Sequence, residues 1–518
     1  MDQRSWSTQG ARGQTGHPPS TKNHQPWQRG FRSLVFSLTL GSLTPALLPT
    51  APAQAQLNEY CRLNPQAIAQ KDQLRAAAIQ GNPTAQTQYQ NLLQQHNDQL
   101  QRCRQTNWPR HQAMWLRIYP CDTKAGMIER ILDDIVNKGY DHLYLEVFAD
   151  SQALLPKNQN NTPWPSRIQT PGLENRDVMA EIIAKGRARG LKVYAWMFGM
   201  NYGYVYGSRG DRQSAMARNG YGETSLEFVQ DGAQAFADPY NVIAQADYKN
   251  LINQMLQRQP DGILFDYIRY PRGTGARSVA ATVADLWIYS PASAQALYNR
   301  AENRQGLSLI EKYLRQGKIT VGDVAAVLAQ YPEEDTPRWQ GRAVAENFLE
   351  AGKALDVSSL HRQLEQDLWL LTVSHAAQGV VDFVNAAAAE AQTRGIPSGA
   401  VFFPGGNQPV GQRGFDSRLQ AWDQFPGSME WHPMSYAVCG STSCIMDEIN
   451  RVRQFAPAGT EIIPALAGDW DRARDNRPSL KDQMAAIQAN FPDITQVSHF
   501  AYSWQEPQFD NDRKFCRV

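Results

Sequence analysis

The chain has 518 residues, 42% of them hydrophobic, and its 51 basic and 50 acidic residues give a formal net charge of +1. A nucleic-acid-binding protein normally carries a basic excess on one face, so this balance argues against nucleic acid as a partner. The length suits one large barrel with additions or two to three smaller domains. The 13 Trp and 20 Tyr residues supply flat faces that suit stacking on sugar rings as well as core packing.

The N-terminal segment has the pattern of an export signal. Basic residues precede an apolar run at 34–48, and Ala53-Gln54-Ala55 then offers the small-x-small pattern after which signal peptidase cuts. We expect residues 1–55 to be a signal peptide with a long polar n-region, followed by a mature protein that is secreted or lies in the periplasm or cell envelope. A retained N-terminal membrane anchor is the alternative.

Residues 56–110 are Gln-rich and helix-prone, and Gly81-Asn82-Pro83 predicts the turn of an antiparallel helical hairpin. In an exported chain the six cysteines favour disulfides over a metal site, and no paired Cys-x-x-Cys spacing predicts zinc. The pairing that we expect, among other connectivities that the sequence leaves open, is Cys61–Cys103, Cys439–Cys444 and Cys121–Cys516.

Strand and helix patterns alternate regularly from residue 111 to the end of the chain. Eight strands are predicted, at 114–120, 142–148, 192–199, 262–266, 398–404, 429–436, 461–468 and 496–504. Helices are predicted between them, including 123–139, 176–190, 247–258 and 373–395. Such alternation implies parallel strands with right-handed crossovers, and eight of them predict an α/β fold of the (β/α)8 TIM barrel type. A doubly wound open sheet is the alternative.

Two stretches are longer than this repeat requires. Residues 200–238 are rich in Gly, Tyr and Arg, and we expect them to lie over the barrel mouth. Residues 272–372 form a mostly helical insertion after the fourth strand. The insertion is expected either to form a wall beside the site or to pack as a decoration on the barrel.

Barrel geometry selects among the acidic residues, because active sites of this fold lie at the C-terminal ends of the strands. The apolar run Gly262-Ile-Leu-Phe265 predicts a buried strand that ends on Asp266, the strongest catalytic candidate. Acidic residues at strand starts are poor candidates: Asp261, Glu430 and Glu461. Weaker candidates lie at or beyond strand ends: Asp150, Asp471 and Glu506.

Two further carboxylates are predicted partners for Asp266. Asp469 follows the seventh strand, although it equally suits a turn or a helix cap. Glu146 lies on the second strand, where a buried, hydrogen-bonded carboxylate is the alternative. A pair of carboxylates can divide acid and base or nucleophile roles, as glycoside cleavage requires. For Asp266 the alternative is a structural salt bridge to Arg117 or Arg269.

Polar and aromatic residues near the predicted mouth are candidates for substrate binding. Aromatic faces pack on sugar C–H surfaces, and buried arginines need a carboxylate or a ligand. The candidates are Arg117, Trp196, Asn201, Tyr202, Arg269, Tyr270, Tyr436 and Trp504. His432 is a further hydrogen-bonding candidate, although a lone His in a strand is more often part of the core. No cofactor or metal is predicted, and no phosphate loop or Gly-x-Ser-x-Gly motif is present.

Several ordered motifs resemble the bacterial glycosyl-hydrolase-like family 10, which is distinct from the xylanase family of the same number. They cover about 400 residues beyond the N-terminal hairpin. The motifs are Tyr144-Leu-Glu-Val-Phe148, Ala153-Leu-Leu-Pro156, Pro163-Trp-Pro165, Val193-Tyr-Ala-Trp196, Phe236-Ala-Asp-Pro-Tyr-Asn241, Asp261-Gly-Ile-Leu-Phe-Asp-Tyr-Ile-Arg-Tyr-Pro271, Trp422 and His432-Pro-Met-Ser-Tyr436.

The resemblance implies an exported glycoside hydrolase that cleaves O-glycosidic bonds of a polysaccharide, with peptidoglycan glycan strands as a plausible target. The chain departs from the family pattern at Tyr267, where a second acidic residue is frequent, at Phe148, where Arg is expected, and at Glu146, where Gln is common. The alternative is a noncatalytic barrel that binds cell-wall carbohydrate. An envelope scaffold that works through the Gln-rich hairpin is a third hypothesis.

Overall fold

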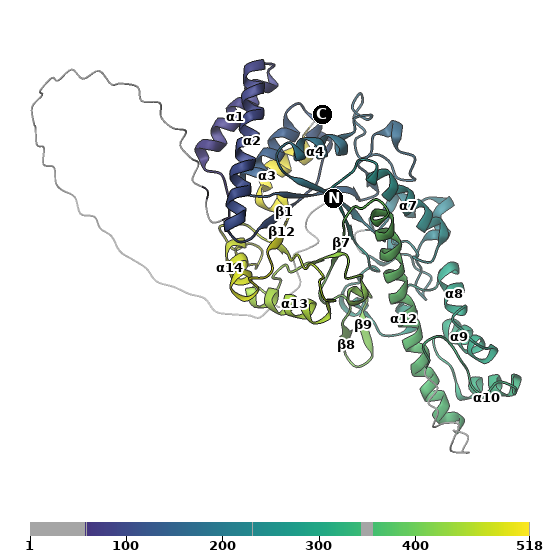
Figure 1. The fold of residues 1–518 in the computed structure, drawn as a ribbon. Coiled ribbons are helices and arrows are strands. Elements are labelled where there is room, and N and C mark those ends of the chain that lie inside the picture. The colour runs from purple at the N-terminus through teal and green to yellow at the C-terminus, as the bar shows by residue number, and fades with distance from the viewer. Residues whose placement is uncertain (1–56, 58–59, 230–231, 343–355, 517–518) are drawn as a thin grey trace, which may run out of the picture. The chain divides into compact units, whose positions relative to one another are not determined.

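The computed structural model describes residues 57, 60–229, 232–342 and 356–516 (Figure 1). The predicted signal peptide therefore falls outside the described residues. None of the helices in the described segments is long and apolar enough to cross a membrane.

A closed barrel of eight parallel strands forms the centre of the protein. The strands are β1 (His111–Leu116), β2 (His142–Ala149), β4 (Lys192–Phe198), β5 (Gly262–Asp266), β7 (Ser398–Phe402), β10 (Glu430–Pro433), β11 (Ala465–Ala467) and β12 (Gln496–Phe500). They pair in the order β10-β7-β5-β4-β2-β1-β12-β11, and parallel bridges from Trp431 to Ile462 and from Met434 to Ala465 close the ring. This arrangement confirms the predicted (β/α)8 barrel.

Helices connect most of the neighbouring strands. They are α3 (Met127–Asn137), α4 (Val178–Arg187), α7 (Val242–Leu256), α12 (Val357–Gln392), α13 (Thr442–Phe455) and α14 (Leu480–Asn490), with α15 (Tyr502–Gln505) and α16 (Pro507–Phe515) after β12. The helix predicted between β7 and β10 is wrong. That Gly- and Pro-rich connection forms the short strands β8 (Pro409–Val410) and β9 (Gly414–Asp416) and a single 3-10 turn at Trp422–Gln424, because these residues disfavour a helix.

Large aromatic side chains fill the barrel interior. The Trp115 ring makes edge contacts with Tyr144 at 4.9 Å and with Trp196 at 4.8 Å, and Tyr144 packs against His432 at 5.5 Å. His432 is fully buried, so it belongs to the core. Gly262 is required beside this layer because a Cβ there would overlap the Tyr194 ring. The interior is therefore a packed core that supports the carboxyl end of the barrel.

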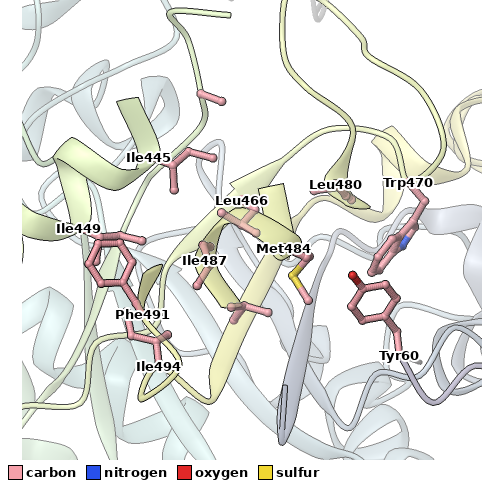
Figure 2. Packing of buried hydrophobic residues seen from close by; sticks show 12 residues of the cluster. Tyr60, Ile445, Ile449, Leu466, Trp470, Leu480, Met484, Ile487, Phe491 and Ile494 are labelled. Atoms are coloured by element: carbon pink, nitrogen blue, oxygen red, sulfur yellow. The ribbon is translucent and has the colours of Figure 1, made fainter. Parts of the chain in front are cut away.

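A second core lies between the barrel wall and helices α13 and α14. Figure 2 shows Leu466 of β11 facing the isoleucines of both helices, and Tyr60 lies beside the Trp470 ring at 5.2 Å. The segment before the hairpin thus packs on the loop that follows β11.

The N-terminal helices are α1 (Pro65–Ile79) and α2 (Pro83–Thr106), and they form a hairpin that turns at Gly81. Each helix starts at an Asn whose side chain accepts a hydrogen bond from its first turn, and each has Pro at its first position. The disulfides are Cys61–Cys103, Cys121–Cys516 and Cys439–Cys444, which confirms the predicted pairing. Disulfides of this kind persist in oxidising compartments.

The insertion after β5 contains α8 (Pro291–Tyr298), α9 (Arg304–Gln316) and α10 (Val321–Gln330). Its last part is continuous with α12, which begins at Val357 rather than near residue 373, where the sequence pattern placed the start of the barrel helix. The amino-terminal part of α12 packs on α10 and projects beyond the barrel with the insertion (Figure 1). The long segment after β4 contains the short helices α5 (Tyr204–Gly207) and α6 (Ser225–Phe228).

Candidate active site

Asp266 is the last residue of β5 and lies at the carboxyl end of the barrel. It is only 7% exposed, and its two oxygens accept hydrogen bonds from Trp196 Nε1 at 3.2 Å and from the Tyr267 backbone N–H at 2.7 Å. Burial raises the pKa of Asp266 from its usual 3.8 to about 6, although the Tyr267 N–H and the charge of Arg269 act in the opposite direction. Near neutral pH this carboxyl group therefore exchanges a proton, as a general acid must.

Asp266 forms no ion pair with any residue in the described part of the chain. The structural salt bridge to Arg117 or Arg269, which was the alternative for this residue, is therefore absent. Both arginines act on Asp266 only through their electrostatic fields. A buried carboxyl group without a paired cation is costly to ionise, which is the physical cause of its raised pKa.

Glu146 of β2 lies between two arginines. Its Oε2 atom is 2.6 Å from Arg117 Nε, and its Oε1 atom is 2.8 Å from Arg167 Nη1. Burial by itself would raise the pKa of Glu146, but the two guanidinium groups hold it below its usual value. Both oxygens are thus occupied by cations, and Glu146 fixes the orientation of Arg117. The Arg117 side chain is 37% exposed and lies 5.6 Å from the centre of the Trp196 ring.

Asp150 follows β2 and is exposed to solvent. Its backbone has a φ of 48°, in the left-handed region that non-glycine residues seldom adopt. The Asp150 charge acts on Arg117 and on Tyr267, and the Arg117 charge in turn acts on Asp266. One exposed and one buried carboxylate therefore share the same cationic and aromatic neighbours.

Tyr267 is a half-buried aromatic residue directly after Asp266, and its backbone also has a positive φ, of 53°. Its ring stacks on Phe198 at 4.2 Å, and the Arg269 guanidinium lies 4.6 Å from the ring centre. Burial raises the pKa of Tyr267 to about 12, so its hydroxyl stays protonated at neutral pH. Tyr267 thus offers a fixed ring and a hydrogen-bond donor beside Asp266.

Two more predicted residues lie at this end of the barrel. Tyr436 is half-buried, stacks on Phe500 at 5.5 Å and is close enough to be affected by the Asp266 charge. Trp504 is also half-buried, and its ring faces the guanidinium groups of Arg474 and Arg477 at 5.6 and 5.0 Å. Both rings keep some exposed surface, which is what stacking on a sugar requires.

Comparison with protein-family models and with curated proteins found no match to this sequence. Solved structures with a similar fold include a glycoside hydrolase domain. The glycoside hydrolase domain of PgaB (BpsB) from Bordetella bronchiseptica matches with a TM-score of 0.47 and 13% identity, over 79% of this chain and 99% of that one.

Two other solved structures match with lower TM-scores. The tandem GH20 catalytic modules of the pneumococcal exo-beta-D-N-acetylglucosaminidase StrH match with a TM-score of 0.36 and 11% identity, over 76% of this chain and 79% of that one. Aspergillus fumigatus Ega3, in complex with galactosamine, matches with a TM-score of 0.31 and 9% identity, over 77% of this chain and 94% of that one. At these identities the likeness is one of fold, and the resemblance to the glycosyl-hydrolase-like family 10 stays a prediction.

Asp469, the predicted partner of Asp266, is engaged within its own loop. Its Oδ2 atom is 2.9 Å from Arg472 Nε, and its carbonyl oxygen accepts a hydrogen bond from the Leu480 backbone N–H. No hydrogen bond or ion pair joins Asp469 to Asp266 or Arg117 in the described segments. The contacts of Asp469 are therefore those of a turn residue.

Four residues predicted to bind substrate have buried structural contacts instead. Trp196 is 1% exposed and orients Asp266. Asn201 accepts hydrogen bonds from the backbone of Gly203 and Ala235, and the Tyr202 hydroxyl donates to the Ala244 carbonyl. Tyr270 is fully buried. These four side chains are buried, and all but Tyr270, whose hydroxyl has no partner among the described residues, make hydrogen bonds within the protein.

The structure also brings in residues that are weak candidates, or no candidates, from the sequence. Arg167 is not among the residues that the sequence predicts for the site, although a buried Glu146 has two carboxylate oxygens and one arginine would satisfy only one of them. Asp150 is the weaker sequence candidate of the two because Glu146, on the strand itself, is better placed to point inward, and the left-handed backbone of Asp150 is visible only in the structure. Tyr267 was noted only as a departure from the family pattern.

A cluster with metal-ligand chemistry lies at the opposite, amino end of the strands. His111, Asp141 and His142 have ligand atoms within 4.8 Å of one another. The Asp141 oxygens already accept hydrogen bonds from both histidines and from the Gln112 N–H, and Arg104 Nε lies 3.8 Å away. The arginine charge opposes a metal ion there, so the contacts describe a hydrogen-bonded ion-pair network.

Proposed function

We propose that the protein is an exported glycoside hydrolase that cleaves O-glycosidic bonds of a polysaccharide, such as peptidoglycan glycan strands, with Asp266 as the general acid. The observation that carries this proposal is the state of Asp266 itself. It is a buried carboxyl group at the catalytic end of a (β/α)8 barrel, held by two hydrogen bonds, without a paired cation and with a pKa of about 6.

Asp150 is the second carboxylate in this proposal, in place of Asp469 and Glu146. It is exposed, it acts electrostatically on Arg117 and Tyr267, and its left-handed backbone is the kind of strain that clusters at functional sites. Glu146 is occupied by two arginines, so its part is to position Arg117.

The reaction balances with these two groups. Protonated Asp266 gives its proton to the glycosidic oxygen as the C1–O bond breaks, and Asp150 either takes a proton from the attacking water or attacks C1 itself. In the second case water then displaces Asp150 from C1, and ionised Asp266 takes the proton of that water. Carboxylates about 5 Å apart accompany retention of the anomeric configuration, and those about 6.5 to 9.5 Å apart accompany inversion. Tyr267, Tyr436 and Arg117 line the sugar site.

Export is supported by two features. The apolar N-terminal run with its small-x-small motif predicts a signal peptide, and three disulfides favour an oxidising compartment.

The test compares the full mature chain with Asp266→Asn and Asp150→Asn on peptidoglycan glycan and a panel of polysaccharides. New reducing ends are expected from the wild type, with a loss of at least about 100-fold in each variant. Asp469→Asn is the matched control and is expected to keep wild-type activity. The anomer of the first product identifies the stereochemistry, since retention indicates that Asp150 acts as a nucleophile and inversion that it acts as a base.

Equal cleavage by wild type and Asp266→Asn would refute the assignment of Asp266. Tight binding of glycan with no cleavage by any form would instead support the noncatalytic carbohydrate-binding barrel.

A further inference from the structure

Arg269 is a buried cation whose charge has no carboxylate partner. It is 5% exposed, and its Nη1 donates a hydrogen bond to the Tyr270 carbonyl at 2.9 Å. No carboxylate oxygen of the described residues lies within ion-pair distance of its guanidinium group. Burial of a guanidinium group without a paired anion is unfavourable, so Arg269 lacks the anion that would stabilise its charge.

The neighbouring arginines differ from Arg269 in this respect. Arg418 forms two hydrogen bonds to the Asp416 carboxylate, at 2.7 and 2.8 Å, and Arg117 and Arg167 share Glu146. Asp416 and Glu146 are therefore already paired with other arginines, and Asp266 acts on Arg269 only through its charge. The charge of Arg418 also acts unfavourably on Arg269, which increases the need for an anion there.

Aromatic rings hold the Arg269 guanidinium in a fixed position. It lies 4.6 Å from the centre of the Tyr267 ring, 5.5 Å from that of Phe236 and 5.8 Å from that of Phe403. Rings can favour a cation, but they supply no acceptor in the plane of the guanidinium fork. The other two Arg269 nitrogens, Nε and Nη2, donate no hydrogen bond to the described residues and are not fully buried, so they keep access to solvent.

Arg269 is also close to the reacting carboxyl group. Its charge is the largest cationic influence on Asp266, and both residues belong to the same strand end, separated by Tyr267 and Ile268. An anion that paired with Arg269 would therefore lie on the sugar bound beside Asp266 or on the next sugar.

We propose that Arg269 binds a carboxylate carried by the sugar at or next to the cleaved linkage, and that the substrates are glycans of carboxylated sugars. A planar guanidinium fork matches a carboxylate with two parallel hydrogen bonds, whereas a neutral sugar leaves the buried charge unpaired. This inference rests on the proposed function for its substrate class, but the binding site itself does not depend on catalysis.

The first experiment measures binding by the full chain carrying Asp266→Asn, so that cleavage does not interfere. The probes are glycan strands of peptidoglycan freed of peptides, which carry lactyl carboxylates, and a polyglucuronate, each paired with the same polymer after reduction of its carboxyl groups to alcohols. We expect at least about 10-fold tighter binding to each carboxylated polymer that fits than to its reduced form. The two polymers distinguish a lactyl from a uronate source.

Adding Arg269→Gln is expected to remove this preference and to leave binding of the reduced polymer unchanged. Arg269→Lys keeps the charge without the fork and is expected to retain part of the preference. Arg453→Gln is the matched control, because Arg453 lies in the last turn of α13, at the other end of the barrel, and its loss should change nothing. The folding of each variant is checked by its thermal unfolding.

Equal binding of carboxylated and reduced polymers by the parent protein would overturn the inference without any variant, as would equal loss on both polymers in Arg269→Gln. The wild-type chain then separates the two proposals. Cleavage of neutral and carboxylated glycans with equal efficiency would refute the carboxylate site and leave the hydrolase. Selective binding without any cleavage would refute the hydrolase and leave the carboxylate site.

Discussion

Replacement of Asp266 by Asn tests the physical state of this carboxyl group independently of any substrate. The folded protein raises the pKa of Asp266 from 3.8 to about 6, because burial penalises its ionised form. Between these two pH values the folded state holds a proton that the unfolded state releases. Stability contributed by this group is therefore lost as the pH rises from about 4 to about 6 and does not return at higher pH.

The size of the effect follows from the same two pKa values. Relative to low pH, where both states hold the proton, linkage lowers the free energy of unfolding by about 0.5 kcal/mol at pH 4 and by about 3 kcal/mol at pH 8. Asn cannot ionise, so the Asp266→Asn variant does not suffer this loss. An amide has one acceptor oxygen instead of two, so one hydrogen bond from Trp196 or Tyr267 is weakened, at a cost of about 1 kcal/mol that does not vary with pH.

We expect the difference in free energy of unfolding between wild type and Asp266→Asn to change with pH. Relative to wild type, Asp266→Asn should gain about 2.5 kcal/mol in free energy of unfolding between pH 4 and pH 8. Urea unfolding of both proteins, with disulfides intact, at several pH values measures this difference. Effects of the other carboxylates cancel, because both proteins contain them.

Glu146→Gln is the matched control with the opposite sign. Two arginines hold the pKa of Glu146 below its usual value, so its ionised form stabilises the fold at neutral pH and this contribution is lost as the pH falls. Removing the charge leaves Arg117 and Arg167 without their anion, and a loss of roughly 3 to 5 kcal/mol is expected at pH 7. A pH-independent difference for Asp266→Asn, or a destabilisation at pH 8 as large as that of Glu146→Gln, would refute the reasoning.

Three further outcomes follow from particular contacts. Trp196→Phe removes the Nε1 hydrogen bond to the ionised form of Asp266, so the pH above which kcat/KM falls, about 6 in the wild type, should move upward in a pH–rate profile. Cys121→Ser with Cys516→Ser opens a loop of 395 residues, and thermal unfolding should show a loss of roughly 2 to 5 kcal/mol. Lys71 is fully buried, and burial lowers its pKa to about 8. Burying the charged ammonium group therefore lowers the free energy of unfolding below pH 8, and this destabilisation is relieved as the pH rises toward 10.5. Lys71→Met should therefore stabilise the protein at pH 7 by up to about 3 kcal/mol in urea unfolding, and an unchanged midpoint would contradict the assignment.

Features with a local physical cause could be predicted from the sequence. Apolar runs bounded by Gly and Pro mark the barrel strands, and Asp266 ends one of them, so its place at the carboxyl end followed once the strands were counted. The hairpin and its disulfide were also predictable, because two helical segments joined by Gly81-Asn82-Pro83 bring Cys61 and Cys103 together. The helix predicted between β7 and β10 does not form, because the strand-helix repeat does not continue through this Gly- and Pro-rich segment.

The sequence by itself therefore determined the strand count, the barrel and the end at which chemistry can occur, since these depend on hydrophobic periodicity and chain order. Only the tertiary structure decided which carboxylates are available. Asp469 is held by Arg472, only three residues on, whereas Arg117 and Arg167 come from different segments and meet at Glu146, and Asp266 is left without a cation. The pairs at Glu146 join side chains far apart in the sequence, which no local pattern encodes, and such pairs determine which acid keeps its proton.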